Sequence, residues 1–174
     1  HPTWSIFMGI EHERIHLETS SVLIRQLDLE WVRPHDDWPI CDAAAASAGE
    51  APVNELLEVA GGTVVQGKSH DAPLYGWDNE YGRLATHVDT FQASRMQVSN
   101  AEFLAFVEAG GYETPEWWTE EGRRWLDFRG AAHPIFWVPR GDSQGHSSWG
   151  YRTMTREIDM PWDWPVDVNY LEAK

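Results

Sequence analysis

The sequence has little cysteine, few basic residues and no long apolar segment. Cys41 is the only cysteine among 174 residues, so no disulfide can form within the chain. The 13 Lys and Arg residues stand against 28 Asp and Glu, a formal charge of -15, which argues against nucleic acid and anionic membranes as partners. No apolar run reaches the roughly 18 residues that span a bilayer. These absences predict a cytoplasmic protein.

Both ends of the sequence suggest an internal piece of a longer protein. The chain starts at His1 without an initiator Met or a signal-peptide pattern. Near the other end, Asn169 and Glu172 form a capping-box pair at the start of a helix that runs out after Lys174. We therefore expect further residues on both sides.

Periodicity divides the chain into three parts. From Trp4 to Leu27, apolar residues and histidines recur at steps of three and four, which predicts a helix ended by Pro34 at the latest. Residues 35–57 are rich in Ala, Ser, Gly and Pro and predict a linker. Residues 58–174 change in texture and predict a second domain, so the domain boundaries are 1–34, 35–57 and 58–174.

The second domain predicts mixed strands and helices, an α+β class. "LLEVAGGTVVQGK" indicates two strands with a turn at Gly61 and Gly62, and "THVDTFQASRMQVS" indicates another strand. Ser99 and Asn100 would cap a short helix over 101–110, and a second helix would follow Pro115. "HPIFWVPRG" and "DMPWDWPVDVNY" show no clear period and predict long loops. The 11 Trp residues are expected to pack this loop-rich structure rather than line a ligand pocket.

The stretch "GIEHERIHLE" carries the main chemical signal. His12 and His16 lie four residues apart, about 40° around a helix and one turn along it, so both imidazoles can converge on one metal ion. Glu13 lies close enough to neighbour such a metal, whereas Glu18 points roughly 120° away from it. We expect Glu13 and Glu18 to act from outside the coordination sphere, Glu18 by bonding a neighbouring helix.

The same letters also fit the zinc-peptidase pattern His-Glu-x-x-His. That function needs a third ligand, and neither a Gly-x-x-His extension nor a helix with a well-placed glutamate comes after His16. The residues after His16, "LETSSVLIRQL", continue the same kind of helix. A peptidase remains an alternative, in which Glu13 is the general base.

"GIEHERIHLETSSVLIRQL" resembles the metal-binding helix of the DinB-like domain in the ergothioneine and ovothiol sulfoxide synthases. "GGTVVQGK", "YGWDNEYG", "VDTFQASRMQVSNAEFLAFVEAGGY" and "WPVDVNYLEA" are similar to successive blocks of the formylglycine-generating-enzyme, or sulfatase-modifying-factor, domain that comes after it. The resemblance covers nearly the whole chain except the linker. It implies the end of a DinB-like helical bundle followed by the first part of a C-type-lectin-like α+β domain.

The resemblance further implies non-haem Fe(II) held by three histidines. His12 and His16 match two of them, and the third ligand of the family comes from an earlier helix, upstream of His1. The implied activity is oxygen-dependent joining of cysteine sulfur to histidine, with L-cysteine, L-histidine and O2 as substrates. Ergothioneine-type relatives often carry Gln before the second ligand histidine, and Ile15 stands there in this chain, which favours the ovothiol-type enzyme, 5-histidylcysteine sulfoxide synthase. The ergothioneine-type activity is the alternative.

Charged residues, most of them in the predicted loops, are candidates for substrate binding. Small zwitterionic substrates need charged groups at their ends, and the candidates, beside Ile15, are Arg14, Asp78, Glu80, Arg83 and Arg152. For each of these charged residues a surface or structural role is favoured over the substrate role; Asp78, for instance, would then only hold a turn. A non-catalytic lectin-like binding module is the other class of function, because that fold hosts many binders. The formylglycine-generating enzymes use cysteines with copper, and Cys41 precedes the second domain, so their chemistry is not expected here.

Overall fold

The structure, a computed structural model, describes residues 3–36, 53–141 and 147–174. It divides into two compact units, His1–Leu23 with Glu55–Arg95 and Ile24–Asn54 with Met96–Lys174. Helices and strands are mixed, as the α+β prediction requires. Most of the predicted linker at 35–57 lies outside the described residues. Within the described part of the chain, no helix is both long and apolar enough to cross a membrane.

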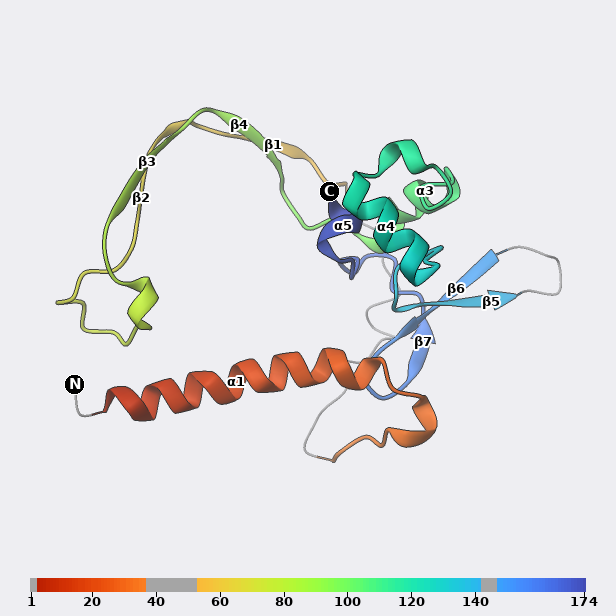
Figure 1. The fold of residues 1–174 in the computed structure, drawn as a ribbon, viewed down its shortest axis with the longest axis horizontal. Helices are drawn as coiled ribbons and strands as arrows, with labels where there is room; N and C mark the ends of the chain where they lie inside the picture. Colours follow the sequence, from red (N-terminus) through yellow and green to blue (C-terminus); the bar gives the residue numbers. More distant parts are fainter. Residues whose placement is uncertain (1–2, 37–52, 142–146) are drawn as a thin grey trace. The chain divides into compact units, whose positions relative to one another are not determined.

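A long helix and an antiparallel ribbon make up the first unit (Figure 1). The helix α1 spans Trp4–Arg25 and so confirms the helix predicted from periodicity, its last two residues belonging to the second unit. Strand β1 (Leu56–Val59) pairs with β4 (Phe91–Ser94), and β2 (Gly62–Gln66) pairs with β3 (Leu84–Val88). The short 3-10 helix η2 (Asp78–Glu80) lies in the connection between β2 and β3.

Two details of this ribbon differ from the sequence prediction. The predicted turn at Gly61 and Gly62 is wrong, because β1 and β2 come one after the other along one side of the ribbon and each pairs with a later strand. A Cβ on Gly61 would lie 2.6 Å from the backbone nitrogen of Thr90, so glycine there permits close approach of these two segments of the backbone. The single strand predicted over residues 86–99 is instead two strands, β3 and β4, interrupted at Asp89 and Thr90.

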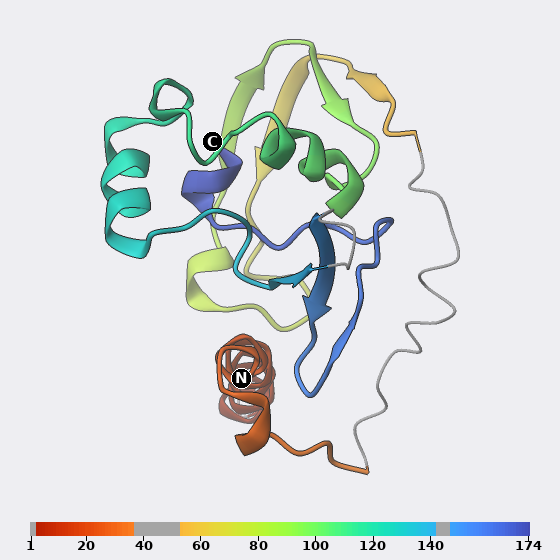
Figure 2. The same ribbon diagram turned by 90° about the vertical axis from the view of Figure 1, so that its right-hand side faces the viewer.

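In the residues that the structure describes, the second unit combines three helices with a small antiparallel sheet. Its strands are β5 (Trp137–Gly141), β6 (Ser147–Arg152) and β7 (Glu157–Asp159), in the order β5-β6-β7 (Figure 2, blue). The predicted loop "HPIFWVPRG" thus contains a strand. Pro139 hid it from pattern analysis, and proline is tolerated there because β5 is an edge strand. The helices are α3 (Asn100–Glu108), α4 (Glu120–Arg129) and α5 (Tyr170–Ala173), with 3-10 turns η1 (Leu29–Trp31) and η3 (Pro115–Trp117).

Local capping sets the helix starts in this unit. Ser99 accepts a hydrogen bond from the backbone of Glu102, whose carboxylate bonds back to Ser99, so the predicted cap of α3 is confirmed. The helix predicted after Pro115 starts later, at Glu120, because the Thr119 side chain caps it and residues 115–117 form a 3-10 turn. Asn169 and Glu172 form the predicted capping box of α5.

Aromatic residues form the core of the second unit. Phe136, Trp137, Tyr151 and Met160 are buried together, and the partly buried residues packed on them are Phe103, Leu104, Val107, Trp149, Ile158, Trp162, Trp164 and Val166. Asn100 is fully buried among them; it accepts from the Trp137 indole (3.0 Å) and donates to the Pro161 carbonyl (2.9 Å). A paired amide inside this core ties the start of α3 to β5. The expected structural role of tryptophan is met at these positions.

Candidate functional site

The two histidines of α1 lie side by side. The ring centroids of His12 and His16 are 4.4 Å apart, with the planes at 75°. Both side chains are exposed. The helix brings them together because residues four apart are neighbours on one face. Two adjacent imidazoles can supply two nitrogen ligands to one ion.

The described residues supply these two nitrogens and no complete metal site. No group of three or more His, Cys, Asp or Glu side chains in residues 3–36, 53–141 and 147–174 is placed to hold an ion. The donor chemistry, neutral nitrogen on adjacent turns of one helix, fits two of the three ligands of a histidine-bound iron. A full site would need at least one ligand from elsewhere.

The other candidates on α1 are exposed. Glu13 and Glu18 lie on the helix surface, and Ile15 is 50% exposed. Arg14 pairs with Glu11 one turn away, with a nitrogen to oxygen distance of 3.1 Å, in a solvent-exposed ion pair. Such pairs contribute little to stability. These side chains are therefore available for contacts, and their predicted roles stay predictions.

The candidates in the connection between β2 and β3 hold local structure. Asp78 Oδ1 accepts from the Asn79 backbone (3.0 Å), and Glu80 Oε1 accepts from the Trp77 backbone (3.2 Å). The turn-holding function considered for Asp78 is thus present. Each carboxylate also keeps an oxygen that these bonds do not use, and Arg83 is exposed just before β3. A substrate role for these residues remains a prediction.

Arg152 is buried in a reciprocal clamp with Arg25. The Arg152 guanidinium donates to the carbonyls of Arg25 (3.0 Å) and Leu27 (2.9 Å), while Arg25 Nε donates to the Arg152 carbonyl (3.0 Å). Arg25 also stacks 3.5 Å from the ring centroid of Phe136 and pairs with Asp167 at 2.9 Å. Burial lowers the pKa of Arg152. The structure thus gives Arg152 a structural role. Its substrate role stays a prediction.

Sequence analysis missed Tyr75, Tyr151 and Tyr112. Burial, with Glu11 next in effect, raises the pKa of the Tyr75 phenol. Burial and the 2.5 Å hydrogen bond to Asp167 raise the pKa of Tyr151 to about 12. Burial and Glu172, 2.5 Å away, raise the pKa of Tyr112. No local signal marks them, because each partner lies far away in the sequence.

Known proteins with similar sequences identify the second domain. A model of the sulfatase-modifying factor enzyme 1-like domain matches residues 42–173. The hercynine oxygenase of Mycolicibacterium smegmatis is 31% identical over 175 residues, which cover 99% of this chain and 37% of that protein. The hercynine oxygenase of Mycolicibacterium thermoresistibile is 35% identical over 102 residues, 58% of this chain and 21% of the relative.

A fungal relative extends the same pattern. Ergothioneine biosynthesis protein 1 of Neurospora crassa is 28% identical over 110 residues, 59% of this chain and 13% of that protein. The chain therefore spans well under half the length of these relatives. The family match begins after Cys41 and does not reach α1, so the DinB-like assignment of residues 1–34 stays a prediction. The chain belongs to the family of sulfatase-modifying factor enzyme 1-like domains.

Proposed function

We propose that this chain is part of an oxygen-dependent, non-haem iron sulfoxide synthase of the ergothioneine type. The observation that carries the proposal is the pair of imidazoles of His12 and His16, 4.4 Å apart on one face of α1. Membership in the sulfatase-modifying factor family supports it, and so does similarity over 99% of the chain to a protein named hercynine oxygenase.

The names of the relatives favour hercynine, the trimethylated betaine of histidine, as the sulfur acceptor. This is the activity that the sequence analysis held as the alternative. The ovothiol-type activity, with unmethylated histidine, is favoured by Ile15. An isoleucine cannot hydrogen-bond an imidazole as a glutamine can, so position 15 is where the two substrates should be distinguished.

The proposed reaction joins a thiol sulfur to a carbon of the imidazole ring and oxidises that sulfur. The C–H and S–H bonds break, dioxygen accepts four electrons, one oxygen atom ends on sulfur and the other in water. Iron(II), when bound by neutral imidazoles, supplies redox chemistry and open positions for small ligands.

The chain's own part is to bind and orient the reactants. His12 and His16 would hold the metal, Glu13 would act beside them from outside the coordination sphere, and Glu18 would bond a neighbouring helix. Arg14 and Arg83 are the proposed partners of substrate carboxylates, and Asp78 and Glu80 of substrate ammonium groups.

The test uses the full-length protein prepared without oxygen and loaded with Fe(II). Oxygen uptake is followed with cysteine plus either hercynine or histidine, and products are identified by mass spectrometry. We expect a coupled sulfoxide, formed faster with hercynine. A His12→Ala/His16→Ala variant should lose both iron and product, whereas His87→Ala, a histidine whose side chain is 71% exposed on β3, should keep both.

The possible outcomes separate the alternatives. Faster turnover with histidine would support the ovothiol-type enzyme in place of the ergothioneine type. Peptide hydrolysis that Glu13→Gln abolishes while the metal stays bound would support a zinc peptidase. A protein that binds no iron and forms no adduct would leave a lectin-like binding module as the better account.

A further inference from the structure

The connection from Lys68 to Tyr81 is a closed structure tied together by one lysine. The Lys68 backbone nitrogen donates to the Glu80 carbonyl (2.9 Å), and its carbonyl accepts from Gly82 (3.1 Å). Its side chain crosses the loop to the Tyr75 carbonyl. Gly76 is buried next to the Lys68 side chain, and a Cβ at Gly76 would lie 3.0 Å from Lys68 Cδ. The loop therefore holds its shape by its own bonds.

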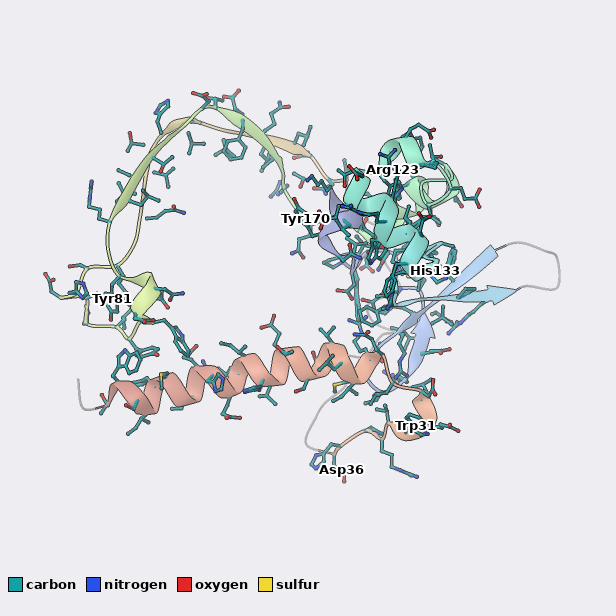
Figure 3. All side chains as sticks on the ribbon, viewed as in Figure 1. Trp31, Asp36, Tyr81, Arg123, His133 and Tyr170 are labelled. Atoms are coloured by element: carbon teal, nitrogen blue, oxygen red, sulfur yellow. The ribbon has the colours of Figure 1, made fainter. Side chains whose placement is uncertain are left out.

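This loop is attached to the first turns of α1. The Tyr75 ring lies 5.9 Å from Trp4 and 5.8 Å from Phe7, centroid to centroid. The Trp4 indole donates to the Gly76 carbonyl at 3.2 Å. We call Trp4, Phe7, Tyr75 and Gly76 the clasp, and all four belong to the first unit. In Figure 3 the loop that carries the labelled Tyr81 lies over the start of α1.

The clasp lies shortly before the two histidines. Phe7 precedes His12 by five residues, about 7.5 Å along a helix axis. The side chains from His12 to Ser20 are all exposed. A helix in a protein owes most of its stability to tertiary packing rather than to propensity, so in this unit the packing at Trp4 and Phe7 restrains the segment that carries the histidines.

We propose that Tyr75 is a positioning residue for the two-histidine face, acting through the clasp. The inference rests on the proposed function of His12 and His16 as iron ligands. Metal ligands must be held within roughly 0.5 Å and 10–20° of their working geometry. The ring of Tyr75, wedged against Trp4 and Phe7, limits fraying and rotation of the turns before His12. The ring carries this effect and the hydroxyl does not.

The test measures Fe(II) affinity of the full-length protein under anaerobic conditions. Tyr75→Ala should weaken binding by about tenfold, the lower end of the effect of removing groups that orient metal ligands. Tyr75→Phe keeps the ring and should bind as the wild type does. The matched control is Leu74→Ala, the neighbouring residue, whose side chain is 74% exposed. It should change nothing.

A second readout does not involve iron. Amide hydrogen exchange of the metal-free protein should rise over residues 8–16 in Tyr75→Ala and stay unchanged in Tyr75→Phe and Leu74→Ala. If Tyr75→Ala lowers the melting temperature but leaves Fe(II) affinity and this exchange as in the wild type, the residue is only structural and the inference is wrong. If the wild type binds no Fe(II), the proposed function fails and the inference fails with it.

Discussion

At the scale of single residues, Arg25 combines three contacts of the second unit in one charged side chain. It stacks on Phe136, pairs with Asp167 and donates to the Arg152 carbonyl. Asp167 is 45% exposed, so solvent weakens its ion pair with Arg25. We therefore expect Arg25→Ala to lower the free energy of unfolding by about 2 kcal/mol, the scale of one charged hydrogen bond with a cation-π contact. Urea unfolding measures it.

The control for Arg25 is an arginine in an exposed pair. Arg124 lies 3.5 Å from Glu120, and both side chains are more than two-thirds exposed. Arg124→Ala should cost less than about 0.5 kcal/mol, as exposed pairs do. Equal losses in the two variants would mean that the clamp adds nothing beyond an ordinary surface arginine.

Tyr151 predicts a dependence of stability on high pH. Burial and Asp167 raise the pKa of Tyr151 to about 12, above the value of about 10 in an unfolded chain. The native state thus holds the phenol proton more tightly, so this contribution is complete below about pH 10 and is lost as pH rises towards about 12. Unfolding midpoints at about pH 9 and about pH 11 should fall further apart in the wild type than in Tyr151→Phe.

The comparison isolates one phenol. Tyr112, whose pKa is raised in the same direction, is present in both proteins and cancels in the difference. A variant with the same pH slope as the wild type would show that Tyr151 does not titrate in this range. The backbone and the ring stay in place in Tyr151→Phe, so large structural change is not expected.

At the scale of elements, we expect Gly61 to decide whether β1 stays paired with β4 next to the pair of β2 and β3. A Cβ there would lie 2.6 Å from the backbone nitrogen of Thr90 and 2.8 Å from the carbonyl oxygen of Val88. These backbone atoms of the opposite segment cannot move aside cheaply, so Gly61→Ala should open β1 from β4. Amide exchange over residues 56–59 and 91–94 should rise sharply in this variant.

The neighbouring glycine provides the matched control. A Cβ at Gly62 meets nothing within 4 Å, and β2 contains it in ordinary extended pairing with Val88. Gly62→Ala should leave exchange in β1 and β4 as in the wild type. Equal exchange in both variants would show that the close approach at Gly61 is not what holds the ribbon.

Helices were easier to predict from sequence than strands in this chain. The helices α1, α3 and α5 are predicted by periodicity or capping pairs, both of which are local. Pro139 hid the strand β5, which pairs with the nearby β6. The pairing of β1 with β4, by contrast, depends on partners far along the chain. Local patterns cannot specify such partners, and so the predicted turn at Gly61 was wrong.

At the scale of the whole molecule, the lack of cysteine in the family-matched segment leads to a prediction about Cys41. Residues 42–173 contain no cysteine, and Cys41 stands just before them. If the activity is that of the histidine-iron proposal, Cys41→Ser should keep iron content and product formation in the full-length protein within about twofold, the scale of a substitution that touches no reacting group. Loss of product with iron retained would point to cysteine chemistry instead. The product assay described for His12 and His16 measures both quantities.

Local sequence was sufficient to predict the α+β class, the long helix and the neighbouring positions of His12 and His16. Residues four apart are neighbours on any α-helix, so no tertiary information is needed for that pair. The clamp between Arg152 and Arg25 and the packing of Tyr75 on Trp4 and Phe7 became visible only in the folded chain. Arg152 lies 127 positions after Arg25, and Tyr75 lies 71 positions after Trp4 (75 − 4) and 68 after Phe7 (75 − 7). Long-range packing, which local patterns do not encode, selects such contacts.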